Sequence, residues 1–387
     1  MKICIISNLY EPHHVGGAEA VAKIQVEELV KQGHELVVIT TKPTGRLNCE
    51  NKNYKIYRFK PLNLFYYKNL SRHNSLIKIV WHILDMFNLH SYFAVKKILK
   101  YDKPDVVITH NLKGIGYLIP KAIKSLEIKH VHNLHDVQLS NPSGLLIKDE
   151  ENSVIAAGLL TKIYENLCKK LFSSADIVIS PSKWLLNFYT DKQFFTKSKS
   201  LVVPNPVEEV AELKVKTTKT NNYLYIGQIE KFKGINWLID FWQKNNIKDN
   251  LFIVGDGGQL EKIKDQSYSH IKVLGRVEKQ ELFDLFDKSD FLIMPSFCYE
   301  SFGKVIIDSY SHSVPVIVRQ GGGVDEIVEN QKTGFLYKSD EEFQLLLDKC
   351  KILSIENYNF LQKNSFNKSK QFVTSEYIKQ LQELLSL

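Results

Sequence analysis

The feature that most constrains the fold is an alternation of short apolar runs with longer amphipathic ones, repeated in both halves of the chain. The first half carries the short runs KICIIS, ELVVIT, PDVVITH, HVHNL, ADIVIS and LVVP, and the second carries NYLYIG, LFIVG, IKVLG, DFLIMP and VPVIV. Continuous β-branched runs separated by helical segments are typical of parallel sheets covered on both faces. The sequence therefore predicts an α/β protein with two doubly wound, Rossmann-like domains that face each other across a cleft.

A Pro-, Thr- and Lys-rich stretch at 203–222 separates the two sets of runs. We predict a first domain at 1–205 and a second domain at 206–365. The polar, helical tail contains no further strand, so we expect a C-terminal helix at about 366–387 to pack back onto the first domain. Ligands bind such domains at the carboxyl ends of the strands, which is where the motifs are sought.

The chain is basic, with a net charge of +8, and only five of its 51 basic residues are arginines. A basic chain favours anionic partners such as phosphate, acidic lipid or nucleic acid. The alternative explanation of the lysine excess is the base composition of the genome. No RNA- or DNA-binding signature accompanies the charge, so we predict no nucleic-acid partner. Five scattered cysteines without a C-x-x-C pair favour a reducing cytoplasm. We expect no signal peptide and no membrane span.

The stretch EPHHVGGAEA follows the first strand and opens a helix. Gly16 and Gly17 allow close approach of a ligand, and a helix N-terminus offers N–H groups to an anion. The alternative is a tight turn that needs glycine only for its geometry.

The stretch VHNLHDVQLSNPSG places His135 and Asp136 at another strand end. A neutral imidazole there can hydrogen-bond a sugar hydroxyl, with Asp136 orienting it. The alternative is a His–Asp pair that caps a loop. We expect His130 and His132 to point into the sheet.

In the second half, YIGQIEKFKGINW places Lys233 at a helix start close to a strand end, where a lysine can hold a diphosphate. Arg276 also follows a strand, in VLGRVEK. The alternative for Lys233 is an ordinary solvated lysine. The alternative for Arg276 is a surface ion pair with a nearby acid.

The stretch YESFGKVIID combines a turn acid with a helix start. Glu300 can bind sugar hydroxyls, and the N–H groups of Phe302 and Gly303 can bind phosphate. The alternative makes Glu300 an acid favoured by the helix dipole and Asp308 a solvated helix residue.

The segment 75–100 is a strongly apolar helix on which Lys78, His82 and Asp85 share one stripe. Over 68–103 the chain has seven Lys or Arg residues against two Asp. A membrane-surface helix fits this basic end, and a core helix of the first domain fits the apolar face.

The order of these motifs resembles retaining glycosyltransferases of the group 1 (family 4) type, which have the GT-B fold. The matching series runs from the GG turn through the His-Asp pair, G-x-x-x-x-x-KG and V-x-G-D-G to PS-x-x-x-E-S-F-G-x-x-x-x-D and GG-x-x-E-I-V. The resemblance implies that the first domain binds the acceptor and the second binds a nucleotide-diphosphate sugar.

Carried over position by position, the resemblance implies that Glu300 and His135 contact the donor sugar and that Lys233 holds the diphosphate. Asp308 stands at the second acid, which binds the ribose hydroxyls. The other implied donor-binding positions are Gly16 and Gly17 over the diphosphate, Gln228 beside it, Ser301, Phe302 and Gly303 at the phosphate and sugar, and Arg276 and Val277 at the base.

Two positions depart from the family pattern. Gln228 stands where an arginine is usual, and it can donate hydrogen bonds without carrying a charge. Asp308 stands where a glutamate is usual. Losing a cation weakens stabilisation of the departing diphosphate unless Lys231 replaces it, so low activity or dependence on a partner is one expected consequence.

The resemblance implies a retaining transfer that needs no metal or other cofactor. Family frequency favours a UDP-sugar donor, and a glycan or lipid-linked saccharide is the expected acceptor, in bacterial surface polysaccharide synthesis. The basic stretch predicts peripheral contact with anionic lipid at the inner face of the plasma membrane. Two alternatives stay open: a non-catalytic or partner-dependent subunit, and an epimerase or phosphorylase of the same fold.

Overall fold

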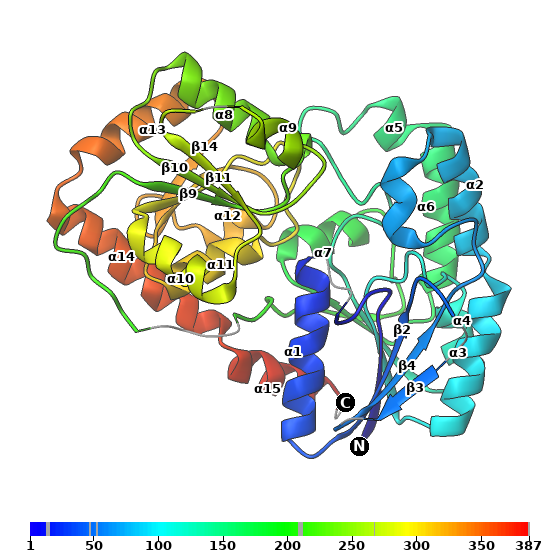
Figure 1. Cartoon of the computed structure of the whole chain (residues 1–387). Coiled ribbons are helices and arrows are strands. Elements are labelled where there is room, and N and C mark those ends of the chain that lie inside the picture. Colours follow the sequence, from blue (N-terminus) through cyan, green and yellow to red (C-terminus); the bar gives the residue numbers. More distant parts are fainter. Residues whose placement is uncertain (13–15, 46–47, 52, 208–211, 267, 386–387) are drawn as a thin grey trace. The chain divides into compact units, whose positions relative to one another are not determined.

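A computed structural model describes the chain apart from residues 13–15, 46–47, 52, 208–211, 267 and 386–387 (Figure 1). The chain divides into two compact units. The N-terminal unit comprises Met1–Leu145, Asn152–Pro204 and Tyr377–Leu387, and the C-terminal unit comprises Leu146–Glu151 and Asn205–Glu376. Part of the expected linker, residues 208–211, lies outside the described residues.

These bounds differ from the predicted domains at two places. Leu146–Glu151 belongs to the C-terminal unit, although it lies within the predicted first domain. The C-terminal unit also continues to Glu376, so only Tyr377–Leu387 joins the N-terminal unit. A short polar segment contains no apolar run that would show which unit it packs on, so the sequence pattern could not place either piece.

The N-terminal unit is built on an eight-stranded sheet with the order β3-β4-β2-β1-β5-β6-β7-β8. All neighbouring pairs are parallel except β3 with β4. The strands are β1 (Lys2–Ile6), β2 (Glu35–Thr41), β3 (Asn48–Asn51), β4 (Lys55–Phe59), β5 (Val106–Thr109), β6 (Lys129–Asn133), β7 (Ile177–Ser180) and β8 (Lys199–Val202).

Helices of the N-terminal unit include one from the far end of the chain. They are α1 (Gly17–Lys31), α2 (Ser75–Met86), α3 (Leu89–Asp102), α4 (Ile119–Lys124), α5 (Val154–Ala157), α6 (Leu159–Phe172) and α7 (Lys183–Thr190), the 3-10 helix η1 (Tyr67–Arg72) and most of α15 (Thr374–Leu385). Ile378, Leu381 and Leu384 of α15 pack in one core cluster with Ile3 and Val26. The last helix therefore completes a core that the first strand begins.

The C-terminal unit is built on a six-stranded parallel sheet with the order β11-β10-β9-β12-β13-β14. Its strands are β9 (Tyr223–Ile226), β10 (Leu251–Val254), β11 (Ile271–Gly275), β12 (Phe291–Met294), β13 (Val316–Arg319) and β14 (Gly334–Tyr337). Its helices are η2 (Lys231–Lys233), α8 (Ile235–Lys244), α9 (Leu260–Lys264), α10 (Lys279–Lys288), α11 (Lys304–Ser311), α12 (Val324–Ile327), α13 (Asp340–Ile352), α14 (Ile355–Ser369) and η3 (Lys370–Phe372).

Neighbouring residues of β9 face opposite cores, as the pleat of a strand requires. Tyr223 and Tyr225 pack in one cluster with residues of α8 and α13, whereas Leu224 packs in a second cluster with residues of α10 and α11. Helices therefore cover both faces of this sheet. The two sheets confirm the predicted α/β class with two Rossmann-like units.

Candidate functional site

The predicted donor-binding residues of the C-terminal unit gather at the carboxyl ends of β9 and β12. These two strands are neighbours in the sheet, and the strand order reverses there, because β10 continues on one side of β9 and β12 lies on the other. Open α/β sheets bind ligands at such a reversal. Lys233 ends η2, after β9, and Glu300 lies on the turn between β12 and α11.

Lys233 and Glu300 form an ion pair, with Lys233 Nζ 2.7 Å from Glu300 Oε1. The Ser296 hydroxyl donates to the same oxygen at 2.5 Å. The two charged side chains are 23% and 15% exposed. Burial raises the pKa of Glu300, but Lys233, the Ser296 hydroxyl and Lys148 together outweigh it and hold that pKa below its usual range. The carboxylate is therefore charged and fixed in direction at neutral pH.

Close backbone packing holds this ion pair together. Gly234 has a φ of 77°, and a Cβ at this position would lie 2.2 Å from the carbonyl oxygen of Pro295. Only glycine lets the start of α8 pass so close to the end of β12. The turn that carries Lys233 is thereby pressed against the segment that leads to Glu300.

The predicted phosphate loop lies at the N-terminus of α11. Gly303 is the N-cap residue with a φ of 92°, and its Cβ would meet Ile306 and Val324 at 3.0 Å. Phe302 is 4% exposed and packs in the core, so its side chain anchors the loop and only its backbone remains for a ligand. Ser301 precedes it in the same turn.

Asp308 lies in the second turn of α11 and takes its partner from its own helix. Its carboxylate binds Lys304 one turn back, with Lys304 Nζ 2.8 Å from Oδ1 and 3.1 Å from Oδ2. The side chain is 34% exposed. Lys304 therefore orients the shorter acid that replaces the family's glutamate.

Three further predicted positions lie on strand ends of the same unit. Gln228 is exposed, and its backbone carbonyl accepts a hydrogen bond from the Tyr225 hydroxyl at 2.6 Å. Arg276 is exposed and pairs with Asp256, Nε to Oδ2 3.1 Å, which is the surface ion pair that the sequence left open. Val277 packs against the core. Lys231, the candidate replacement for the missing arginine, is exposed in η2.

In the N-terminal unit, Gly16 caps α1 and Gly17 begins it. The Gly16 N–H donates to Glu19 Oε2 at 2.8 Å, and Glu19 is buried. This carboxylate already occupies the Gly16 N–H that the sequence offered to an anion. The neighbouring histidines of the predicted loop, residues 13 and 14, lie outside the described residues.

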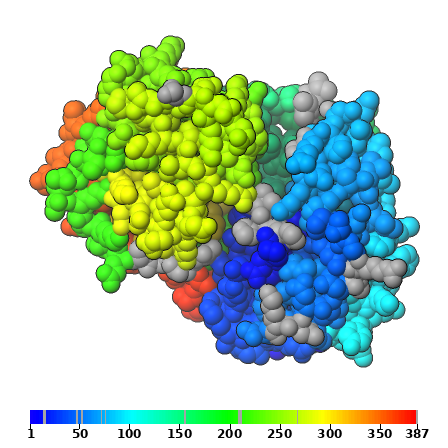
Figure 2. Space-filling view, viewed as in Figure 1, coloured from blue at the N-terminus to red at the C-terminus, as the bar shows by residue number. Residues whose placement is uncertain are grey.

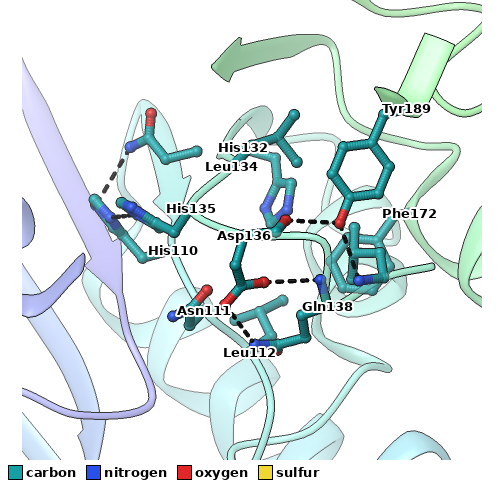
Figure 3. A pocket seen from close by; sticks show the side chains of 12 residues that line it. His110, Asn111, Leu112, His132, Leu134, His135, Asp136, Gln138, Phe172 and Tyr189 are labelled. Atoms are coloured by element: carbon teal, nitrogen blue, oxygen red, sulfur yellow. Dashed lines mark hydrogen bonds between the residues drawn. The ribbon is translucent and has the colours of Figure 1, made fainter. Parts of the chain in front are cut away.

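His135 follows β6 and is oriented by His110, not by Asp136. His110 Nδ1 lies 2.8 Å from His135 Nε2, and the two rings are stacked (Figure 3). Asp136 instead accepts from the backbone N–H of Gln138 at 2.8 Å and from its side chain at 3.3 Å. The prediction that Asp136 orients His135 is therefore wrong, because the short acid closes its own turn.

A chain of polar side chains continues behind His110. Its Nε2 lies 3.0 Å from Gln25 Oε1, and Gln25 Nε2 donates to the Tyr377 hydroxyl of α15 at 2.5 Å. Gln25 Oε1 can only accept, so the shorter contact makes His110 Nε2 a donor and His110 Nδ1 the acceptor for His135 Nε2–H. The longer contact of Asn133 Nδ2 with His110 Nε2, at 3.3 Å, would need the opposite tautomer. The Nδ1 of His135 is left as a hydrogen-bond acceptor.

Burial keeps this chain uncharged. It lowers the pKa of His135 to about 4 and that of His110 well below its usual range. Both imidazoles are therefore neutral at pH 7 and line one small pocket with Asp136 (Figure 3). The expectation for His130 and His132 is confirmed, since both are buried and bind the Thr109 hydroxyl at 2.8 Å.

Sequence reasoning missed His110, Gln25 and Tyr377. The signal for His110 was present, since it follows a strand in PDVVITH. No local sequence pattern distinguishes Gln25, which lies on a helix, or Tyr377, which lies 352 residues after it.

The helix predicted at 75–100 is two helices, α2 and α3. α2 buries Asp85 together with the apolar Trp81 and Met86, whereas Lys78 and His82 are half-buried. Asp85 accepts from the Gly114 N–H at 2.7 Å. The opposite side of the helix exposes apolar side chains such as Leu76, which is 76% exposed, where an amphipathic surface helix would expose polar ones.

No group of three or more His, Cys, Asp or Glu side chains among the described residues is placed to hold a metal ion. None of the helices described is both long and apolar enough to pass through a bilayer.

Comparison with known proteins gives a family match for each part of the chain. Residues 15–209 match the family described as Glycosyltransferase Family 4, and residues 220–353 match Glycosyl transferases group 1. The "Uncharacterized 42.6 kDa protein in cps region" of Klebsiella pneumoniae is 25% identical over 334 residues, 84% of this chain and 87% of that protein.

Alpha-monoglucosyldiacylglycerol synthase of Acholeplasma laidlawii is 24% identical over 381 residues, 88% of this chain and 86% of its own. Anabaena Alr3699/HepE in complex with UDP has a similar structure, with a TM-score of 0.70, 17% identity and 100% of both chains covered. This likeness confirms the predicted GT-B fold. The chain therefore belongs to Glycosyltransferase Family 4.

Proposed function

We propose that this glycosyltransferase moves a sugar from a UDP-sugar to a lipid-linked saccharide, with retention of anomeric configuration and without a metal ion. The observation that carries the proposal is the Lys233–Glu300 pair at the reversal of strand order, beside the N-terminus of α11. A charged lysine and a helix N-terminus suit a diphosphate, and a fixed carboxylate suits sugar hydroxyls.

In the proposed reaction, the bond between the anomeric carbon and the diphosphate breaks, and the acceptor oxygen attacks from the same face. The departing phosphate oxygen takes the proton of the acceptor hydroxyl. Lys233 and the α11 N-terminus stabilise the charge on the diphosphate. Glu300 holds the sugar, and the neutral His135 accepts a hydrogen bond from a sugar hydroxyl through Nδ1.

The donor and the chemistry are tested together with the purified chain. A thermal-shift panel of nucleoside diphosphates and their sugars should show the largest rise in melting temperature with UDP and one UDP-sugar. NMR of the product should then show the anomeric configuration of the donor. A larger shift with GDP or ADP, or an inverted product, would contradict the proposal.

The same assay separates the rival functions. Gln228 motivates a subunit that works only with a partner, and transfer or donor hydrolysis by the chain alone would exclude that function. An epimerised nucleotide sugar, or dependence on free orthophosphate, would instead show an epimerase or phosphorylase. We expect transfer without a partner, because Lys233 and the α11 N-terminus already supply two sources of positive potential.

We further propose that the face of α2 lies on an anionic membrane from which the acceptor is taken, in bacterial surface polysaccharide synthesis. Exposed apolar side chains of α2 continue onto α6, which α2 contacts through His82 and Tyr164. They are Leu76, Ile77, Ile79, Val80, Ile83 and Leu84 on α2 and Leu159, Leu160 and Ile163 on α6.

Charge around this face fits anionic lipid headgroups. Lys68 and Arg72 of η1 precede α2 and are exposed, and so is Lys162 of α6. α2 forms part of the outer surface of the N-terminal unit (Figure 2). The named relatives support the setting, since one lies in a cps region and another is a diacylglycerol glycolipid synthase.

Vesicle sedimentation tests this contact. The chain should bind vesicles containing phosphatidylglycerol at low salt, more weakly at high salt, and hardly at all when they are pure phosphatidylcholine. Leu76→Gln with Ile83→Gln should weaken binding. Leu345→Gln, at a similarly exposed position on α13 of the C-terminal unit, is the matched control. Equal binding by all three proteins, or no binding at either salt concentration, would contradict the proposal.

A further inference from the structure

A short segment, Leu146–Glu151, docks on the C-terminal unit although the chain on both sides of it belongs to the N-terminal unit. We call this segment the strap. It pairs with the residues just before Glu300: the Lys148 N–H donates to the Phe297 carbonyl at 2.9 Å, and the Tyr299 N–H donates to the Leu146 carbonyl at 2.8 Å. These bonds make the strap a short antiparallel partner of the Glu300 turn.

Lys148 extends from the strap to the ends of two strands. Its Nζ donates to the Ser296 carbonyl, just beyond β12, at 3.0 Å and to the Arg319 carbonyl, the last of β13, at 3.2 Å. Those two ends carry the turn with Glu300 and the loop Gly321–Gly323. One side chain therefore joins the Glu300 turn to this glycine loop.

The glycine loop is shaped to admit this lysine. A Cβ on Gly321, whose φ is 141°, would lie 2.5 Å from Lys148 Cε and 3.0 Å from its Nζ. The same loop pairs with Glu300, whose carbonyl accepts from the Gly323 N–H at 2.7 Å. Lys148, the glycine loop and Glu300 thus form one packed layer.

Lys148 also adds positive charge close to Glu300. Burial lowers the pKa of Lys148 to about 8, with Cys298 and Glu300 acting against that shift. The charge of Lys148 adds to that of Lys233 in lowering the pKa of Glu300. Two lysines from different segments therefore favour the charged form of one carboxylate.

We propose that Lys148 is a positioning residue of the donor-sugar site: from the strap, it holds the Glu300 turn and the glycine loop in the arrangement that receives the sugar. This inference rests on the proposed function, since it assigns Glu300 to the sugar. It makes the donor site depend on a segment whose flanking chain belongs to the N-terminal unit.

The test replaces Lys148 by Met, which keeps much of its length and removes the ammonium group. We expect kcat/KM for the UDP-sugar to fall up to about a hundredfold, since small displacements of a reacting group have effects of that size. Affinity for UDP alone should stay within twofold, because UDP lacks the sugar that Glu300 holds. Gly321→Ala, which displaces the lysine, should reproduce this pattern, and Lys148→Arg should restore part of the activity.

Lys219→Met is the matched control. Lys219 also donates to backbone carbonyls of the C-terminal unit, those of Cys350, Lys351 and Leu353, away from Glu300. If Lys148 only stabilised the unit, the two Met variants would lose melting temperature and activity together, and UDP affinity would fall as well. That result would overturn the inference.

The pH profile gives a second readout. Loss of Lys148 should move the acid limb of kcat/KM to higher pH, because Glu300 then keeps only Lys233 as a cation. Besides Lys233, Cys298 and Tyr225 interact with Glu300, and Arg319 and Asp325 interact with Lys148. An unmoved acid limb would overturn the inference.

Failure of this inference differs from failure of the proposed function. If Glu300→Ala abolishes transfer and Lys148→Met changes nothing, only the role of Lys148 is wrong. If neither variant changes transfer, the assignment of the sugar site itself is wrong.

Discussion

The Glu300 region of the C-terminal unit and the His135 region of the N-terminal unit differ in charge: the first stabilises an ionised carboxylate, and the second keeps its imidazoles neutral. Around Glu300, two lysines and a serine hydroxyl surround a carboxylate that stays charged. Around His135, a buried series of neutral side chains passes hydrogen bonds to α15 without any net charge. One region fixes a charge, and the other fixes the direction of a hydrogen bond.

The difference suits the parts of the proposed donor. A diphosphate and its departing charge need cations and helix N-termini, which the C-terminal unit supplies. A sugar hydroxyl needs a neutral acceptor of known orientation, since an imidazolium could only donate.

The largest effect is expected for Glu300→Ala. It removes the carboxylate that Lys233 and Ser296 orient, so kcat should fall about a thousandfold, as when a preorganised polar group is lost from an active site. Initial rates with the UDP-sugar, and circular dichroism for the fold, measure the result. Glu329→Ala, which also removes an acid paired with lysines in this unit, is the control. Unchanged turnover in Glu300→Ala would refute the site assignment.

A smaller effect is expected for His110→Phe. Without its acceptor, His135 should lose its fixed tautomer, and kcat/KM should fall about tenfold, which corresponds to the loss of one hydrogen bond of about 1.4 kcal/mol. Nitrogen-15 NMR should show His135 protonated at Nε2 in the unmodified protein.

Thr109→Val is the control for this variant, because it removes buried hydrogen bonds to His130 and His132 and leaves the His110–His135 pair untouched. Protonation of His135 at Nδ1 in the unmodified protein would show that the order of donors is reversed.

Acid should destabilise the N-terminal unit first. Burial lowers the pKa of His82, His110, His130, His132 and His135. The unfolded chain therefore binds more protons below pH 6.5, and the stability from neutral histidines is lost as the pH falls from about 6.5 towards 4. Asp85 and Asp136, whose pKa values burial raises to about 7 and about 6, oppose this trend.

Five histidines outnumber these two acids, and each one kept neutral loses about 2 kcal/mol between pH 6.5 and 5. We therefore expect a net loss of several kcal/mol at pH 5, with a fall of roughly 10 °C or more in melting temperature. The Lys233–Glu300 pair, with a lowered pKa on Glu300, weakens only as the pH falls below about 4.5. Hydrogen exchange with mass spectrometry, corrected for the intrinsic rate, resolves the two units. Equal losses in both units between pH 7 and 5 would remove this difference.

The smallest effect is expected for Asp308→Glu. The longer side chain keeps Lys304 within reach and extends towards the ribose, so KM for the donor should fall by up to about threefold, the value of part of a hydrogen bond. Lys304→Met should raise KM by a similar factor. A higher KM in Asp308→Glu would mean that the pocket is built around the aspartate.

Much of the C-terminal site could be predicted from the sequence, because its residues lie within a few positions of strand ends. Lys233 and Glu300 lie in the short loops that follow β9 and β12, before the next α-helix begins. The strap and the His110–Gln25–Tyr377 series could not be predicted, since their contacts join segments that no local pattern relates. The exposed apolar face of α2 could not be predicted either, because periodicity shows that a helix has an apolar stripe without showing which stripe is buried.

The return of the C-terminus to the first unit has a consequence for synthesis on the ribosome. Ile378, Leu381 and Leu384 belong to the core that contains β1, so that core stays open until α15 has been made. A fragment ending at Pro204 would expose this apolar surface, and a cut before Tyr377 would detach the residue at the end of the hydrogen-bond series from His135.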